Sequence, residues 1–293
     1  MTTDFACHVC PFDCGVDRSQ AQGICQAPNE LMISKVQKHF DEEPFISGIK
    51  GEGSGTIFFT HCNLGCIFCQ NYLISQEGKG HASSATGFAE ICEALAAEGA
   101  LNINLVSPTP YSHLLVPALT EAKKRMPLPI VWNSNGYETV ETLRSLEGLV
   151  DVYLPDLKYF TDTLAVKYSS APKYFEFASQ ALLEMRRQQP VDVFNGQDHI
   201  QKGLVLRHLM LPGCSSDTLE LLGWVHDHLG NRTMLSLMAQ YYPTYQAATC
   251  PEIDRRLTAE EYQAGVDFLD EHGFENALVQ ELSSADCSYT PDF

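Results

Sequence analysis

Short apolar runs alternate with longer amphipathic stretches from residue 56 onward. The apolar runs have the length of buried strands, and the amphipathic stretches have the apolar spacing of helices. Strands are predicted at 56–60, 102–106, 129–132, 150–154, 204–211 and 234–238, and helices at 88–98, 113–125, 139–145, 174–187, 216–229 and 258–271. Thr258 and Glu261 have the spacing of a capping box at the start of the last helix.

These six strand–helix units in series predict an α/β fold with a parallel sheet and right-handed crossovers. Six units are too few for a closed eight-stranded barrel, so we expect a partial, TIM-like (β/α)6 barrel that is open on one side. We expect this core over residues 51–273, a C-terminal extension over 274–293, and a cysteine-rich segment with a linker over 1–50. Within the last of these, residues 31–50 are expected to be a connection, because proline and glycine interrupt them.

Each predicted strand ends, or nearly ends, in polar or charged residues. In parallel barrels the active site forms at the carboxyl ends of the strands, so these ends predict one shared pocket. Arg207 is costly to bury inside a strand unless it has a partner, whereas His208 faces the other way and is expected to be a satisfied core histidine. The six ends are Thr60-His61-Cys62, Ser107-Pro108-Thr109, Asn133-Ser134-Asn135-Gly136, Asp156-Leu157-Lys158, Arg207-His208 and Gln240-Tyr241.

Three cysteines follow the first predicted strand at the spacing Cys62-x3-Cys66-x2-Cys69. Three thiolates on one tight loop can hold three irons of a [4Fe–4S] cluster, which normally takes four protein thiolates. No fourth cysteine stands nearby in the sequence, so one iron would be open, as in catalytic metal sites. A zinc site with His61 as fourth ligand and inert buried thiols are the alternatives.

A second set of cysteines stands near the start of the chain, at Cys7, Cys10, Cys14 and Cys25. The short spacings and the lack of apolar periodicity around them predict a segment that needs a metal to fold. Structural zinc, an auxiliary iron–sulfur cluster and loose thiols all remain open for this set. The four other cysteines stand alone and are expected to be inert: Cys92, Cys214, Cys250 and Cys287.

The three-cysteine loop, with Phe68 before its last cysteine and Gln70-Asn71 after it, resembles the signature of radical S-adenosylmethionine (SAM) enzymes. The surrounding chain is similar to the branch related to pyruvate formate-lyase activating enzymes. The resemblance implies a [4Fe–4S] cluster whose open iron binds SAM, and reductive cleavage of SAM to a 5′-deoxyadenosyl radical. It also implies an electron donor such as flavodoxin or ferredoxin, and a glycyl-radical enzyme as partner.

Two other functions stay open beside this one. The first is a radical SAM enzyme that acts directly on a small molecule or peptide. The second is a non-catalytic iron–sulfur or zinc protein, or an electron carrier, which predicts no SAM binding.

The resemblance also implies that the strand ends after the cysteine loop bind SAM. Asp156 and Lys158 match an Asp-x-Lys of the activating enzymes, and Arg207 is a candidate for pairing with a carboxylate. Two positions in the cysteine loop depart from the family, with His61 in place of a common glycine and Gly65 in place of a frequent arginine. The remaining candidates for SAM are Ser107, Thr109, Asn133, Ser134, Asn135 and Gln240. For the three at 133–135, a simple Asn-Gly turn is the competing interpretation.

Composition narrows the setting of this chemistry. The 293-residue chain has a net charge of −18, which disfavours a broad nucleic-acid surface. Eleven cysteines, seven of them before residue 70, point to metal binding in a reducing compartment. No apolar run approaches the ~18 residues of a membrane helix, and the first residues lack the pattern of a signal peptide. A cytoplasmic protein without a membrane partner is therefore expected.

Overall fold

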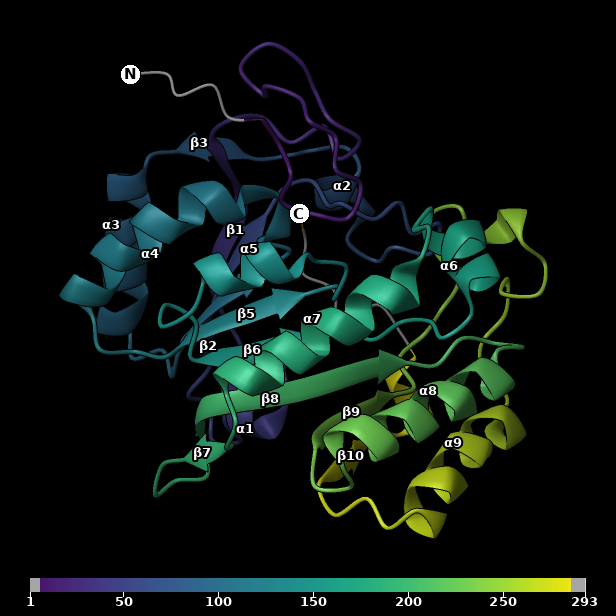
Figure 1. Ribbon diagram of the computed structural model, residues 1–293. Helices are drawn as coiled ribbons and strands as arrows, with labels where there is room; N and C mark the ends of the chain where they lie inside the picture. Colours follow the sequence, from purple (N-terminus) through teal and green to yellow (C-terminus); the bar gives the residue numbers. More distant parts are fainter. Residues whose placement is uncertain (1–5, 286–292) are drawn as a thin grey trace.

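The computed structural model describes residues 6–285 and residue 293. A ten-stranded, mostly parallel sheet curls through the described part of the chain as a partial barrel, in the order β10-β9-β8-β6-β5-β4-β2-β1-β3, with β7 paired to β8 (Figure 1). The strands are β1 Leu31–His39, β2 Ser54–Phe59, β3 His81–Ser83, β4 Ile103–Val106, β5 Ile130–Ser134, β6 Val152–Pro155, β7 Val193–Phe194, β8 Ile200–Leu209, β9 Met234–Met238 and β10 Ala277–Val279.

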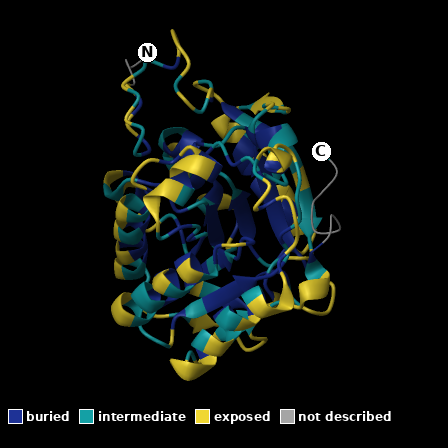
Figure 2. Ribbon diagram, turned by 90° about the vertical axis from the view of Figure 1, so that its right-hand side faces the viewer, coloured by how far each residue is buried: buried dark blue, intermediate teal, exposed yellow. Residues whose placement is uncertain are grey.

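Helices cover the outer face of this sheet. Figure 2 shows the strands buried and the helices exposed along their outward sides. The helices are α1 Pro44–Ser47, α2 Tyr72–Ser75, α3 Ala85–Ala97, α4 Ser112–Arg125, α5 Val140–Ser145, α6 Asp162–Ser169, α7 Tyr174–Gln188, α8 Ser215–Leu229 and α9 Ala259–Glu271, with 3-10 turns at η1 Thr109–Tyr111, η2 Ala247–Thr249 and η3 Leu282–Ser284. Among the residues described, no helix combines the length and apolarity that crossing a membrane requires.

The predicted α/β fold and partial barrel are confirmed. The six predicted strands correspond to β2, β4, β5, β6, β8 and β9, and each of these pairs in parallel with the next. Burial on both faces explains why such strands appear in the sequence as short continuous apolar runs. The capping box is also present, since Thr258 accepts the Glu261 N–H at 3.2 Å and Glu261 accepts the Thr258 N–H at 2.9 Å.

The prediction that residues 31–50 are only a connection is wrong. Residues 31–39 form β1, which runs antiparallel to β2, and residues 44–47 form α1. The polar and basic residues on β1 hide its strand pattern, as is usual at a sheet edge. The short strands β3, β7 and β10 and the helix α6 were also not predicted, because segments of two to eight residues carry little periodicity.

Helix α1 enters the barrel at the amino ends of the strands. Ile46 is fully buried, and its backbone carbonyl accepts a hydrogen bond from Asn102, just before β4, at 2.7 Å. The barrel interior packs around this side chain. The residues that pack with it are Val131, Val152, Leu154, Ile200 and Val205. Residues 40–47 therefore form an inner floor, and the space above it opens toward the carboxyl ends of the strands.

Candidate active site

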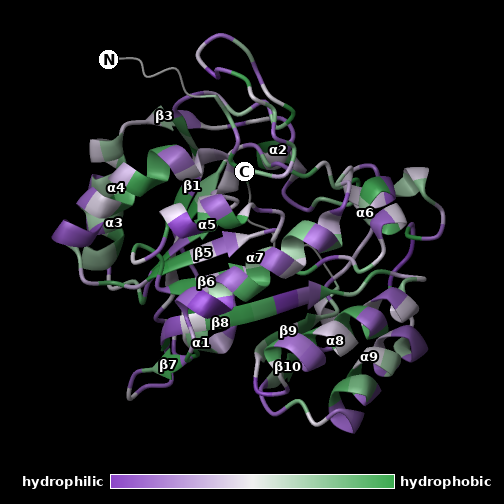
Figure 3. Ribbon diagram, in the orientation of Figure 1, coloured by the Kyte–Doolittle hydropathy of each residue, from purple (hydrophilic) through white to green (hydrophobic). Residues whose placement is uncertain are grey.

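A cavity of about 540 Å³ lies above this floor, at the carboxyl ends of the strands. Strand β8 illustrates the change in character along the barrel, since it is hydrophobic over most of its length and hydrophilic close to its end (Figure 3). Almost every residue predicted for the core site lines the cavity: Cys62, Cys66, Cys69, Ser107, Asn133, Ser134, Asn135, Asp156, Lys158, Arg207 and Gln240. The exception is Thr109, which is buried and donates its hydroxyl to Glu138 at 2.8 Å.

The cysteine loop leaves β2 and returns through α2. Each sulfur has a polar neighbour from a different part of the chain. Cys62 Sγ accepts from Asn135 Nδ2 at 3.2 Å, Cys66 Sγ accepts from the Ser169 hydroxyl at 3.0 Å, and Cys69 Sγ lies 3.2 Å from the Ser75 hydroxyl. Donors at the sulfurs stabilise thiolates and tune an iron–sulfur cluster.

The loop fits a cluster better than a single ion. Zinc needs four ligands that converge about 2.3 Å from one point, and the loop has only three thiols to supply them. A cubane takes one thiolate per iron and needs no such convergence. His61, the alternative fourth ligand, instead lies 2.7 Å from the Thr60 hydroxyl and 3.0 Å from the Tyr111 hydroxyl through Nδ1.

Burial determines the protonation of these thiols. It raises the pKa of Cys62 to about 12 and that of Cys69 to about 11, and neighbouring sulfurs add to both effects. Without metal the thiols are therefore protonated at neutral pH, and binding of iron has to displace the protons.

An ion-pair network crosses the cavity beside the cysteines. Arg207 donates through Nε to Asp156 at 3.0 Å, through Nη1 to Glu42 at 3.1 Å and through Nη2 to Asn133 at 2.6 Å. Lys158 Nζ lies 2.7 Å from the other oxygen of Asp156. Burial acts to raise the pKa of Asp156, but Lys158 and Arg207 together hold it below its usual value. Arg207 therefore has the buried partners that its position in a strand requires, namely Asp156, Glu42 and Asn133.

The turn after β5 has the geometry of the predicted Asn-Gly turn. Ser134 donates its hydroxyl to Glu138 at 2.8 Å, and Asn135 accepts the Tyr137 N–H at 2.9 Å, which is a local turn bond. Gly136 has φ of +75°, and an added Cβ would lie 2.5 Å from the Asp156 carbonyl oxygen, so this position requires glycine. The Asn-Gly turn is therefore real, and it aims the Asn135 amide at Cys62.

Two non-glycine residues just after β2 and β4 adopt the left-handed conformation that favours glycine. His61 has φ of +60° and Ser107 has φ of +57°. His61 is a position at which the resembled family commonly carries glycine. The backbone at His61 and Ser107 has a conformation that glycine favours, although neither residue is glycine.

Sequence reasoning missed Glu42 and Glu43 on the floor of the cavity. Glu42 Oε1 accepts from Asn104 at 2.9 Å and from Asn133 at 3.3 Å. The only signal was a run of three acidic residues just before a proline, in a stretch interpreted as a connection. His208 is a satisfied core histidine, as expected, because its two nitrogens lie 2.7 Å from the Leu157 carbonyl and 2.9 Å from the Thr218 hydroxyl.

The amino-terminal cysteines lie outside this cavity. Their segment projects at the top of the molecule in Figures 1 and 2. It is held to the barrel by Phe12, whose ring packs edge-on against Tyr137 at 5.5 Å, and by the Thr142 hydroxyl, which donates to the Val9 carbonyl at 2.9 Å. Arg18 Nη2 lies 3.0 Å from Cys7 Sγ. Burial raises the pKa of Cys10 to about 12, with contributions from the three other thiols.

Three of the remaining cysteines can be placed. Cys92 and Cys214 are buried and Cys250 is partly buried, all without a disulfide, whereas Cys287 lies outside the described residues.

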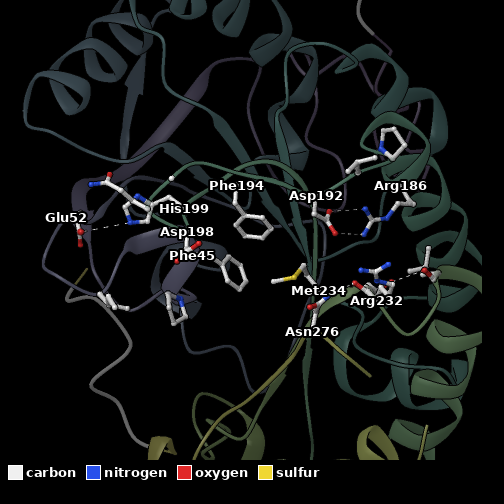
Figure 4. Close-up of a pocket in the computed structure, with 18 of the residues that line it drawn as sticks. Phe45, Glu52, Arg186, Asp192, Phe194, Asp198, His199, Arg232, Met234 and Asn276 are labelled. Atoms are coloured by element: carbon white, nitrogen blue, oxygen red, sulfur yellow. Dashed lines mark hydrogen bonds and ion pairs between the residues drawn. The ribbon is translucent and has the colours of Figure 1, made fainter. Parts of the chain in front are cut away.

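A second cavity, of about 1030 Å³, opens at the amino ends of the strands. Figure 4 shows Phe45, Phe194 and Met234 in its centre, between His199 on one side and the Arg186–Asp192 ion pair on the other. None of the predicted site residues lines it. The predicted core-site residues thus gather at the smaller cavity and not at the larger one.

Comparison with known proteins agrees with this site. A sequence model described as the Radical SAM superfamily matches residues 56–196, which include the cysteine loop. A Methanocaldococcus jannaschii protein named only as uncharacterized is 30% identical over 276 residues, or 92% of this chain and 75% of that protein.

Solved structures show the same fold at low sequence identity. Streptococcus suis SuiB bound to the precursor peptide SuiA has a TM-score of 0.53, and SuiB bound to SAM has one of 0.52, each at 12% identity over 76% of this chain. The chain spans about half the length of SuiB, 47% and 48% in the two structures. The sequence model shows that residues 56–196 form a radical SAM superfamily domain, with a [4Fe–4S] cluster and SAM as its cofactors.

Proposed function

We propose that Cys62, Cys66 and Cys69 hold the [4Fe–4S] cluster and that the cavity beside them binds SAM and the substrate. The observation that carries this is the opening of all three thiols onto one cavity that also contains the Asp156–Lys158–Arg207 network. When bound, the cluster supplies the electron that cleaves SAM and produces a 5′-deoxyadenosyl radical. The electron donor would be a small protein such as flavodoxin or ferredoxin.

In this proposal, the chain's own residues bind SAM and orient it beside the cluster. Lys158 has three ammonium protons and uses one on Asp156, so two remain for the carboxylate of SAM. Arg207 already donates to Asp156, Glu42 and Asn133, so we assign it to positioning Asp156 and Asn133 instead of binding the ligand itself. Ser107, Ser134, Asn135 and Gln240 are proposed SAM contacts at the rim. Thr109 is a positioning residue for Glu138, because its side chain is turned away from the cavity.

For the substrate, we favour a small molecule or a peptide group that enters the cavity. Its volume of about 540 Å³ lies within the ~300–1,000 Å³ that holds a drug-sized ligand, so only a compact group fits beside SAM. The buried acidic floor offers a specific contact for such a group.

Activation of a glycyl-radical enzyme is the second candidate, and the Asp156-x-Lys158 motif favours it through the resemblance to activating enzymes. It predicts that a glycyl radical appears on a partner enzyme encoded beside this protein. Electron paramagnetic resonance of the mixed proteins checks this, because a glycyl radical has a characteristic doublet and a small-molecule reaction leaves none.

The amino-terminal cysteines are proposed to bind a second metal, as zinc or an auxiliary cluster. The segment 1–50 would then be a metal-stabilised appendage of the core 51–273, and 274–293 an extension from it.

Anaerobic reconstitution tests the core of this proposal. Wild-type protein is loaded with iron and sulfide, metals are counted, and SAM with dithionite is added. We expect 5′-deoxyadenosine, with about four irons per chain if the amino-terminal site holds zinc and about eight if it holds a cluster. An iron-loaded protein that neither binds nor cleaves SAM would overturn the proposal and favour an electron carrier.

A further inference from the structure

We propose that Glu43 receives a cationic nitrogen group of the substrate, so that the substrate is an amine or a guanidine. This inference deepens the proposed function, because it assumes that the cavity above the floor is where the substrate binds. Glu43 is not among the residues proposed above to contact SAM.

Glu43 lies deeper in the barrel than the residues proposed for SAM. It lines the cavity together with Ser236, whose hydroxyl hydrogen-bonds the carboxylate. Ser236 lies in the middle of β9, two residues before the strand ends at Met238, and strand geometry places it about 7 Å below that end. A group that reaches Glu43 therefore occupies the space between the rim and the floor.

The charges around Glu43 do not balance. Three carboxylates, Glu42, Glu43 and Asp156, face two cations, Lys158 and Arg207. Asp156 and Glu42 use both of their oxygens on these cations and on asparagine amides. Glu43 is therefore the carboxylate that is left without a cation of its own.

Two buried acceptor atoms in the barrel interior have no donor among the described residues. They are Glu43 Oε2 and Asn104 Oδ1, and the two side chains are only 9% and 0% exposed. A buried acceptor without a donor is costly, because it has lost its water and gained nothing in return. Of the two, Glu43 lines the cavity and can be reached by a hydrogen-bond donor, and ammonium and guanidinium groups are pure donors.

The protonation of Glu43 is consistent with an empty receptor for a cation. Burial raises the pKa of its carboxyl group, while Arg207 acts in the opposite direction. An incoming cation would favour the ionised form in the same way as Arg207 does. A substrate with only acceptors would instead require Glu43 to stay neutral.

The test is calorimetric titration of the anaerobically reconstituted, SAM-loaded protein with probe molecules of similar length. Putrescine and agmatine carry cations, whereas butanediol is neutral and succinate is anionic. We expect a saturable site for a cationic probe, with butanediol and succinate binding at least about tenfold more weakly, the usual size of a charged hydrogen bond. Glu43→Gln should lose that preference while SAM affinity and iron content stay at wild-type values.

Two further variants make the result specific. Glu43→Asp keeps the charge but retracts it by one methylene, so it should retain the preference for cations at reduced affinity. Glu93→Gln removes a carboxylate from the exposed face of α3 and should change nothing. The inference is overturned if cationic probes bind no better than butanediol, or if Glu43→Gln binds them as well as the wild type. Because the titration needs no turnover, a wild type that failed to cleave SAM would count against the proposed function alone.

Discussion

The two cysteine sets of this protein contain the same residue type in very different surroundings. The sulfurs of Cys62, Cys66 and Cys69 open onto a cavity, and their polar neighbours come from three separate elements. The amino-terminal set lies in loops outside that cavity, close to the Arg18 guanidinium. Burial raises thiol pKa values in both sets, so ease of ionisation does not distinguish them.

The two sets differ in the space and the charged groups beside their sulfurs. A ligand can reach the cysteine loop from the cavity, which also contains the buried ion pairs of Asp156 with Lys158 and Arg207. The amino-terminal set has the protein on one side and solvent on the other, with no comparable charged network among the described residues. Open access is what a catalytic metal needs, whereas a closed set of thiolates suits a structural one. Four predictions test this distinction.

Replacement of Cys66 by alanine should have the largest effect. It removes one of three protein ligands, so cluster iron should be lost and 5′-deoxyadenosine formation should fall to background. Iron counting and chromatography of the products check this. Cys92→Ala is the matched control, since Cys92 is also fully buried but stands alone in α3. If Cys66→Ala kept its iron and still formed 5′-deoxyadenosine, the loop would not be the site of the cluster.

Replacement of Arg207 by methionine should come next. It leaves Asp156 and Glu42 buried without their shared cation, and breaking such a pair costs about 3–5 kcal/mol of unfolding free energy. Denaturant unfolding measures the loss. Arg125→Met breaks an exposed pair with Glu121 and should cost less than about 1 kcal/mol. Equal losses in the two variants would show that the network is no more than surface charge.

Replacement of Cys14 by alanine should separate the two sets. We expect loss of the amino-terminal metal and faster proteolysis of residues 6–30, with cluster iron and SAM cleavage as in the wild type. Metal analysis and limited proteolysis, run beside Cys66→Ala, provide the comparison. Loss of SAM cleavage in Cys14→Ala would instead give the amino-terminal set a part in catalysis, for example as an electron relay.

The smallest effect should follow from Phe12→Ala. The edge-on contact with Tyr137 is expected to contribute about 1 kcal/mol to docking of the amino-terminal segment. Hydrogen exchange of residues 6–25 should accelerate, while metal content and activity remain unchanged. Unaltered exchange would mean that the metal, and not this contact, holds the segment in place.

Several features of the fold and site could be predicted from the sequence because they depend on neighbours along the chain. The parallel strands show as apolar runs, the capping box needs only Thr258 and Glu261, and the three-cysteine loop is complete within eight residues. The polar ends of the strands predicted the pocket because parallel strands bring these ends to one side of the sheet.

Other features were decided by contacts between residues far apart in the chain. Glu42 meets Arg207 across 165 positions, because β1 pairs antiparallel with β2 and then releases α1 into the barrel. Thr109 misses the cavity because the η1 turn directs its hydroxyl to Glu138. The local pattern of apolar and polar residues does not predict contacts between residues so far apart in the chain.

The sequence by itself therefore determined the strand–helix series and the three-cysteine loop. Only the tertiary structure decided which charges meet inside the barrel and which carboxylate there lacks a cation of its own.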